Sequence, residues 1–427
     1  MNSRERVIAT INHKKADKVP VDLGGTCVSS ISATAYYRLR EALGLEKKPV
    51  EIFEMLQFVA KVDDEVRKIL GIDTVPLCYP VDTLGNPLNE RKAFTTPIGI
   101  PALVSKNSEW DLLPDGSVVM YPRGDRSVPP SLHMLSDGMY FDNITERIPA
   151  FDEDNLQPLE DFKDDFGLIS GEIAAHLQIE SKRLFTDTSY AIVGQFPGAM
   201  FGDTGLNPGP GIRQPRGIRK MDDWLMAHLL HPEYLEAVYD MQMGFVMKNL
   251  EIYKQAVGDT IQIILVNSAD FGTQNAEMIA PEIYRKLYKP RCKKINDWIH
   301  QNTNWKTMYH SCGCIVNLLD DFIEMGVDII NPVQLSAKGM DPRMLKDKYS
   351  GRLVFWGGGI DTQKTLPFGA PEGVRREALS RLELLSKGSG YIFNPVHNIV
   401  GKTSVNNILA FFNAAREFNG DPLIANL

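Results

Sequence analysis

His310 and Cys312 are the side chains of this sequence whose types and spacing are best suited to chemistry. They are separated only by Ser311, near the end of an apolar run at 306–312. Residues two apart on a strand point to the same side of the pleat, so we expect the imidazole and the thiol to face the same way. Together they can hold a metal ion at about 2.0 to 2.3 Å, and zinc favours this mixture of nitrogen and sulfur. A buried thiol beside a hydrogen-bonded histidine is the alternative that the spacing leaves open.

A catalytic zinc site takes three protein ligands and keeps its fourth position open. His397 is the third ligand that we favour, because it ends another apolar run, at 391–397, and closure of a barrel brings inward residues of different strands toward one axis. Cys314 is the competing candidate. It lies past the expected strand end, next to Gly313, and is expected to turn into the following loop.

Short runs rich in Val, Ile, Phe and Tyr recur along the chain without strict alternation, which is typical of fully buried parallel strands. Long amphipathic stretches, typical of crossover helices, separate them. We expect strands at 19–23, 74–78, 190–195, 261–268, 306–312, 327–333, 353–357 and 391–397. Eight strands, each followed by helix, predict one (β/α)8 TIM barrel over residues 1–427. A doubly wound open sheet is the alternative fold.

The second and third expected strands are about 110 residues apart, far more than one crossover needs. Within this interval, 104–113 and 117–121 flank a Pro-Asp-Gly turn and predict a hairpin. We interpret residues 95–165 as an inserted cap over one mouth of the barrel. Its aromatic residues are candidate substrate walls, or else the hairpin's own core: Trp110, Tyr121, Tyr140 and Phe141.

Polar residues gather where the expected strands end, which is the face that carries the site in barrel enzymes. Asp270, Gln274 and Asn331 are candidate catalytic residues. Capping of the helix that begins near Pro281 is an equal alternative for Asp270. Asn331 could merely satisfy the barrel rim. The candidate substrate-binding residues are Asp22, Gln195, Gln334 and Asp361, and Asn267 is a further polar residue at a strand end.

Composition excludes several classes of protein. The net charge of −8 and the pI near 5.6 argue against a nucleic-acid-binding surface. No apolar run reaches the roughly 18 residues of a membrane span, and no apolar segment follows the first residues as in a signal peptide. We therefore expect a cytoplasmic protein, monomeric or homodimeric. Five cysteines in so long a chain do not predict a disulfide framework.

Several motifs, in order along nearly the whole chain, resemble the uroporphyrinogen decarboxylase superfamily. They are RVIATINH at 6–13, DKVPV at 17–21, DFGTQ at 270–274, APEIY at 280–284, HSCG at 310–313, GVDIINP at 326–332, GGGID at 357–361 and GYIFNPVH at 390–397. The resemblance implies a (β/α)8 barrel. Members of the superfamily fall into two branches that catalyse different reactions. One branch decarboxylates uroporphyrinogen with N-terminal arginines. Here LGGTCV stands at 23–28 where those arginines belong, which argues against a tetrapyrrole carboxylate as substrate.

The other branch comprises zinc- and cobamide-dependent methyltransferases, which hold zinc with a His-x-Cys pair and a cysteine in the last strand. His310 and Cys312 match the pair, and His397 stands in place of the last cysteine. One thiolate and two imidazoles would leave zinc a net charge of about +1, which makes it a stronger Lewis acid toward an ether oxygen.

The resemblance therefore predicts methyl transfer from an O-methylated small molecule, such as an aryl methyl ether, to a corrinoid. No Asp-x-His-x-x-Gly segment occurs in the chain, so we expect the corrinoid on a partner protein. A metal-free decarboxylase of a non-porphyrin acid, with Asp270 and His397 as acid and base, is the alternative. A barrel that binds a ligand without turnover is the third reading.

Overall fold

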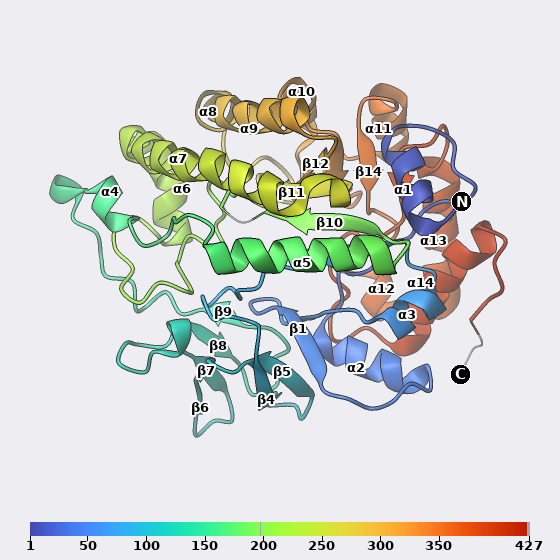
Figure 1. Ribbon diagram of the computed structural model, residues 1–427, viewed down its shortest axis with the longest axis horizontal. Coiled ribbons are helices and arrows are strands. Elements are labelled where there is room, and N and C mark those ends of the chain that lie inside the picture. Colours follow the sequence, from blue (N-terminus) through green and yellow to red (C-terminus); the bar gives the residue numbers. More distant parts are fainter. Residues whose placement is uncertain (197, 425–427) are drawn as a thin grey trace.

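Seven parallel strands form the centre of the protein in the computed structural model, which describes residues 1–196 and 198–424 (Figure 1). In spatial order they are β15 (Tyr391–Ile392), β14 (Val354–Trp356), β13 (Ile329–Asn331), β12 (Lys306–His310), β11 (Ile263–Asn267), β10 (Ala191–Gln195) and β3 (Thr74–Leu77). Each lies within one of the expected runs. Nearly all of their residues are buried, as continuous apolar runs require.

The first expected strand, at 19–23, is not a regular strand. On one side Asp22 N–H donates to Phe393 O (2.9 Å) and Phe393 N–H donates to Pro20 O (2.8 Å). On the other side Asp73 N–H, just before β3, donates to Val21 O (2.8 Å). Val21 N–H donates to the Asp73 carboxylate instead of a strand carbonyl, and this limits the pairing to one bridge. The segment thus spans the two edges of the curled sheet, which gives an α/β fold like a TIM barrel.

Helices surround the central sheet (Figure 1). They are α1 (Ser3–Ile11), α2 (Ala33–Ala42), α3 (Asp64–Leu70), α4 (Pro158–Asp161), α5 (Gly171–Asp187), α6 (Met221–Leu230), α7 (Pro232–Val257), α8 (Pro281–Leu287), α9 (Lys289–Asn302), α10 (Leu319–Glu324), α11 (Pro342–Tyr349), α12 (Thr365–Phe368), α13 (Pro371–Leu385) and α14 (Val405–Phe418). None of the helices in the described ranges is long and apolar enough to cross a membrane.

Helix α1 has a separate role in positioning the site. Its Val7 and Ile11 pack among inward side chains of the strands, including Val193, Met308 and Trp356. Arg4 N–H donates to Ser189 O, just before β10 begins. The helix therefore closes the end of the sheet where the strands begin, and the opposite end, where they finish, remains for ligands.

Two small sheets lie to one side of the central sheet (Figure 1). One has the order β2 (Val59–Ala60), β1 (Val50–Glu54), β5 (Pro101–Ser105) and β4 (Arg91–Thr95), and the other β6 (Trp110–Leu112), β7 (Val118–Met120), β8 (Leu132–Met134) and β9 (Asp142–Asn143). β6 and β7 pair antiparallel around the Pro-Asp-Gly turn, with Leu113 N–H donating to Ser117 O (2.8 Å). The run expected at 104–113 is divided between β5 and β6, because a turn in which Ser108 N–H donates to Ser105 O interrupts it.

Candidate metal centre and its cavity

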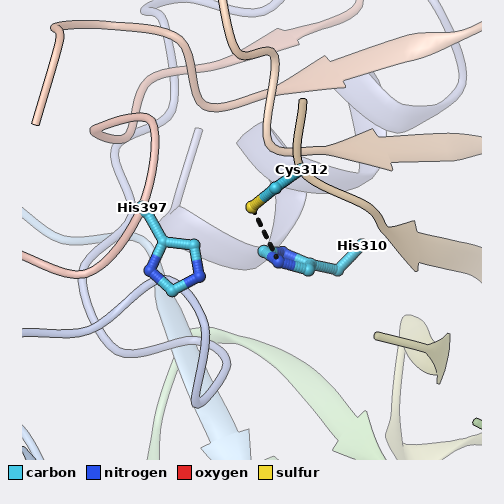
Figure 2. A group of neighbouring side chains, drawn as sticks. All are labelled: His310, Cys312 and His397. Atoms are coloured by element: carbon cyan, nitrogen blue, oxygen red, sulfur yellow. Dashed lines mark hydrogen bonds between the residues drawn. The ribbon is translucent and has the colours of Figure 1, made fainter. Parts of the chain in front are cut away.

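His310, Cys312 and His397 meet where the central strands end. One nitrogen or sulfur atom from each lies within 4.8 Å of the other two, and the described residues contain no other such group of three metal-ligating side chains. Figure 2 shows His397 facing the His310 and Cys312 pair. The strand itself ends at His310, so the expectation that Cys312 lies on it was wrong. His397 likewise lies five residues beyond β15, in the following loop.

Asn331 at the end of β13 fixes the protonation of the His310 ring. Asn331 Nδ2 donates to the Trp356 carbonyl (3.1 Å), which can only accept, so its Oδ1 is the atom that faces His310 Nδ1 (2.6 Å). His310 Nδ1 therefore carries the hydrogen and Nε2 keeps its lone pair. Burial lowers the pKa of His310 to about 4, which keeps the ring neutral near pH 7. An orienting hydrogen bond of this kind typically accompanies a ligating histidine.

Backbone N–H groups of the loop that contains Cys312 donate to side chains of neighbouring loops, and these hydrogen bonds hold Cys312 in place. Its N–H donates to Asp270 Oδ1 (2.7 Å), and Gly313 N–H donates to Gln334 Oε1 (2.7 Å). Gly313 has φ +85°, and a Cβ added there would lie 2.3 Å from the carbonyl carbon of Gly272. The loops at 270–274 and 310–314 thus contact each other through two glycines. Burial and the nearby Asp270 carboxylate raise the pKa of the Cys312 thiol, and a bound cation would oppose both effects.

Cys314 turns away from the centre, as expected from its position. Its N–H donates to Thr273 O (2.7 Å), and the residue is buried in the loop that follows β12. It is not part of the cluster of candidate ligands in the described chain.

His397 has a hydrogen-bonding pattern unlike that of His310. Asn398 N–H donates to His397 Nδ1 (2.8 Å), so the hydrogen of the neutral ring lies on Nε2. The ring centroids of the two histidines are 5.1 Å apart, at an interplanar angle of 76°. Burial and His310 lower the pKa of His397 to about 3. His397 can bind a cation through Nε2 only if that hydrogen is displaced, and as found it is a hydrogen-bond donor.

The separation of His310 and Cys312 fits a shared zinc ion. His310 Nε2 lies 3.4 Å from Cys312 Sγ. Tetrahedral coordination at the usual Zn–N and Zn–S distances would place the two atoms about 3.5 Å apart. The donor set also fits, since a neutral imidazole and a thiol that can lose its proton are typical zinc ligands.

A cavity of about 780 Å³ adjoins the candidate metal centre and has the volume of a small-molecule site. His310, His397 and Asp270 line it together with the glycine-rich loop at 202–211 and Phe141 next to β9. The side chain of Asp270 is 42% exposed, but that surface belongs to the cavity lining, and burial there raises its pKa. Of the four aromatic residues expected as substrate walls, Phe141 is the one found in this lining.

The polar residues expected at the site lie in three different places relative to the cavity and the candidate metal centre. Asp270 and Gln195 line the cavity. Asn331 and Gln334 lie behind the centre and contact His310 and the Cys312 loop. Asp22, Gln274 and Asp361 are not found in the cavity lining among the described residues.

The last three have other contacts. Asp22 is fully buried and accepts hydrogen bonds from Gly25 N, Thr74 Oγ1 and Trp356 Nε1. Gln274 bonds Gln363 at the surface (3.1 Å). Asp361 lines a separate pocket of about 180 Å³. The geometry therefore favours structural roles for Asp22 and Gln274. It does not support substrate binding by Asp22 or catalysis by Gln274.

Sequence reasoning named Asp270 among the acidic residues of the cavity and missed the others, including Glu54 and Asp203. Asp203 follows Gly202 at the start of a stretch unusually rich in glycine and proline, 202–217, and this composition was the available signal for a ligand-binding loop. Glu54 ends β1, in a small sheet whose position relative to the cavity no local pattern predicts.

The model of the uroporphyrinogen decarboxylase (URO-D) family matches residues 213–418, from just before α6 to the end of α14. The expected resemblance to the uroporphyrinogen decarboxylase superfamily is confirmed. The match contains β11 to β15 and all three candidate ligands, whereas the superfamily-like motifs at 6–13 and 17–21 lie outside it. No curated protein matches the sequence.

A solved structure of a methyltransferase from Methanosarcina mazei has the same fold. The two structures superpose with a TM-score of 0.55, over 98% of this chain and 99% of that chain, at 14% sequence identity. At this identity the likeness establishes the fold, and activity must be argued from the site itself.

Proposed function

We propose that the protein is a zinc-dependent methyltransferase that moves a methyl group from an O-methylated small molecule to a corrinoid carried by a partner protein. The observation that carries the proposal is the cluster of His310, Cys312 and His397 beside a cavity of ligand size. The superfamily match and the fold shared with a methyltransferase support it.

Zinc bound there would act as a Lewis acid on the ether oxygen, and one thiolate with two imidazoles leaves it a net charge of about +1. The protein's own contribution is positioning. Asn331 keeps the His310 Nε2 lone pair available, and Asp270 holds the Cys312 amide. Preorganised contacts of this kind avoid reorganisation when charge develops on the leaving oxygen.

The cavity also supports delivery of the corrinoid by a partner. At about 780 Å³ it suits a methyl donor of ordinary metabolite size. The cobalt must reach the methyl group from the mouth of the cavity, where a separate corrinoid protein can dock. We propose a monomer or a homodimer as the working form of the chain.

Metal analysis combined with turnover tests this function. We expect about one zinc per chain, with loss of zinc and of methyl transfer to a reduced corrinoid in His310→Ala and Cys312→Ala. Formation of methylcobalamin, followed by its visible spectrum across a panel of methyl ethers, is the readout. Cys314→Ala is the matched control and should keep both properties. Full activity in chelator-treated, zinc-free protein would contradict the proposal.

A metal-free decarboxylase is the second candidate, and one observation favours it. The hydrogen on His397 Nε2 makes that ring a hydrogen-bond donor, and Asp270, whose pKa burial raises, lines the same cavity. The two groups could serve as acid and base. Release of carbon dioxide from a carboxylic acid by zinc-free protein, abolished in His397→Phe, would establish this function in place of methyl transfer.

A further inference from the structure

The cavity beside the candidate metal centre has a strongly acidic wall. Seven of its lining residues are aspartate or glutamate, and the basic residue among the described lining is Arg123, which is exposed. One of the acids, Asp165, is paired with Arg219 through both carboxylate oxygens (2.9 and 2.7 Å). Others have no such partner.

Glu54, Asp82, Asp203 and Asp270 have no lysine or arginine partner in the described parts of the chain. Their hydrogen bonds come from neutral groups. Glu54 accepts from Leu56 N, Gln57 N and Thr83 Oγ1, and Asp203 Oδ1 accepts from Gly205 N (2.8 Å) and Leu206 N (3.1 Å). Two histidines lie near one member of this set, Asp270. His310 is 3.7 Å away and His397 is the second, and burial keeps both rings neutral.

This negative charge is poorly solvated. Burial, together with the charges of Asp270 and Glu54, raises the pKa of Asp203 to about 7, and burial raises that of Asp82 to about 6. Carboxylates are normally relieved of such a cost by a nearby cation. A single metal ion does not fit this role, because the four side chains do not form a group with metal-ligand spacing in the described structure.

Two amide groups independently point to a ligand in the same cavity. Gln195 is nine-tenths buried, and its Nε2 faces the carbonyls of Gly25 and Val193, which leaves Oε1 without a donor among the described residues. Asn267 is 2% exposed, and its Oδ1 accepts from Ala269 N, which leaves Nδ2 without an acceptor in the described part of the chain. Both residues line the cavity. A polar atom without a hydrogen-bond partner in a nearly buried side chain lowers the stability of the fold, unless a ligand or a water molecule supplies the missing hydrogen bond.

Aromatic rings complete the wall. Tyr79, Phe141, Phe196 and Tyr239 line the cavity with the acidic residues. Aromatic faces attract alkylated ammonium groups, and carboxylates add to that attraction. Aromatic rings and unpaired carboxylates together disfavour an anion and suit an organic cation.

We propose that the methyl donor carries a positively charged nitrogen, held by Asp203 and Glu54 while its methoxy group lies at the His310, Cys312 and His397 end. This substrate class rests on the proposed methyl transfer, and it narrows the donor from any methyl ether to a cationic one. The unpaired Gln195 oxygen supplies a further acceptor for the same charge.

Three small ligands that differ in charge test the proposal by calorimetric binding. The probes are (2-methoxyethyl)trimethylammonium, its uncharged carbon isostere 1-methoxy-3,3-dimethylbutane, and methoxyacetate. We expect the cation to bind at least about tenfold more tightly than the isostere, and methoxyacetate not to bind. Equal binding of the cation and the isostere, or preference for the anion, would overturn it.

Two conservative variants locate the charge that matters. Asp203→Asn keeps the oxygen that accepts from Gly205 and Leu206, so the loop can retain its turn. We expect Asp203→Asn and Glu54→Gln each to weaken cation binding about tenfold and to leave binding of the neutral isostere unchanged. Asp347→Asn, which removes a charge at an exposed position of α11, is the matched control. Cation binding unaffected by both cavity variants would contradict the assignment.

Zinc content measured on the same samples separates the two proposals. Zinc without a preference for the cation leaves the methyltransferase standing and overturns the cationic donor. Preference for the cation in a protein that binds no zinc overturns the methyltransferase and leaves a cation-binding cavity.

Discussion

His310 Nδ1 lies 2.6 Å from Asn331 Oδ1, and the amide nitrogen of the same asparagine is bound to the Trp356 carbonyl. The hydrogen-bonding chain from β14 through β13 to β12 therefore decides which nitrogen of His310 is free to bind a cation. A candidate ligating atom thus depends on two strands that themselves contribute no candidate ligand.

Asn331→Ala should weaken zinc binding about 10- to 100-fold, because the His310 ring loses the contact that fixes its tautomer. Asn331→Asp keeps an acceptor at the same place and should bind zinc more tightly than Asn331→Ala. Competition with a coloured chelator measures both affinities. Equal affinity in the wild type and Asn331→Ala would show that the contact has no part in metal binding.

His397→Ala distinguishes a metal ligand from a hydrogen-bond donor at that position. If His397 is the third ligand, as we propose, the variant should lose zinc affinity by a factor comparable to that of Cys312→Ala. Retention of tightly bound zinc together with loss of turnover would assign His397 to a hydrogen bond with the substrate, which its contact with Asn398 N–H permits by leaving the hydrogen on Nε2. The measurements are zinc titration and single-turnover methyl transfer.

Gly313→Ala should destabilise the protein by about 2 to 4 kcal/mol, because the added Cβ would meet the Gly272 backbone and the residue has positive φ. Gly351 is the matched control, since its φ is +77° and no atom lies within 4 Å of an added Cβ. Gly351→Ala should cost about 1 kcal/mol. Chemical denaturation of both variants checks the difference, and equal costs would contradict the close packing of the two loops.

Asp203→Asn should stabilise the protein more at pH 8 than at pH 5. The pKa of Asp203 is raised to about 7 in the folded protein, against an ordinary value near 4 for an unfolded chain. Between these values the folded state holds a proton that the unfolded state has released, so this carboxyl lowers stability as pH rises through the window.

The full shift corresponds to about 4 kcal/mol. Because Asp203 is partly exposed to the cavity, we expect a gain on the order of 1 to 2 kcal/mol in the variant at pH 8. Glu54, Asp270 and Cys27 face the same group and should be unchanged in the comparison. A gain at pH 5 equal to that at pH 8 would exclude ionisation of Asp203 as its cause.

Sequence patterns predicted the positions of the central strands because fully buried strands leave continuous apolar runs, such as the one around Ile263. They did not predict where strands end. Cys312 leaves the strand because its amide is bound by Asp270, a contact made across 42 residues. Such contacts depend on how loops from different strands meet, and local composition does not encode them.

The candidate ligands were predictable because His310 and Cys312 lie close in the chain and the curled sheet brings the segment after β15 toward them, although His397 itself lies past the end of that strand. The partners that orient them were harder to assign. Asn331 was expected at the strand end, but its role as the acceptor for His310 depends on the Trp356 carbonyl of a neighbouring strand. The unpaired acids Glu54 and Asp203 come from the small sheet and a loop, whose approach to the cavity is a property of the tertiary structure.

X-ray absorption at the zinc edge tests the central claim most directly. On the purified wild-type protein, our account predicts one sulfur at about 2.3 Å and imidazole nitrogens at about 2.0 Å from the zinc, with the sulfur signal lost in Cys312→Ala and kept in Cys314→Ala. Two sulfur ligands, or a sulfur signal that disappears with Cys314, would contradict the assignment of His310, Cys312 and His397.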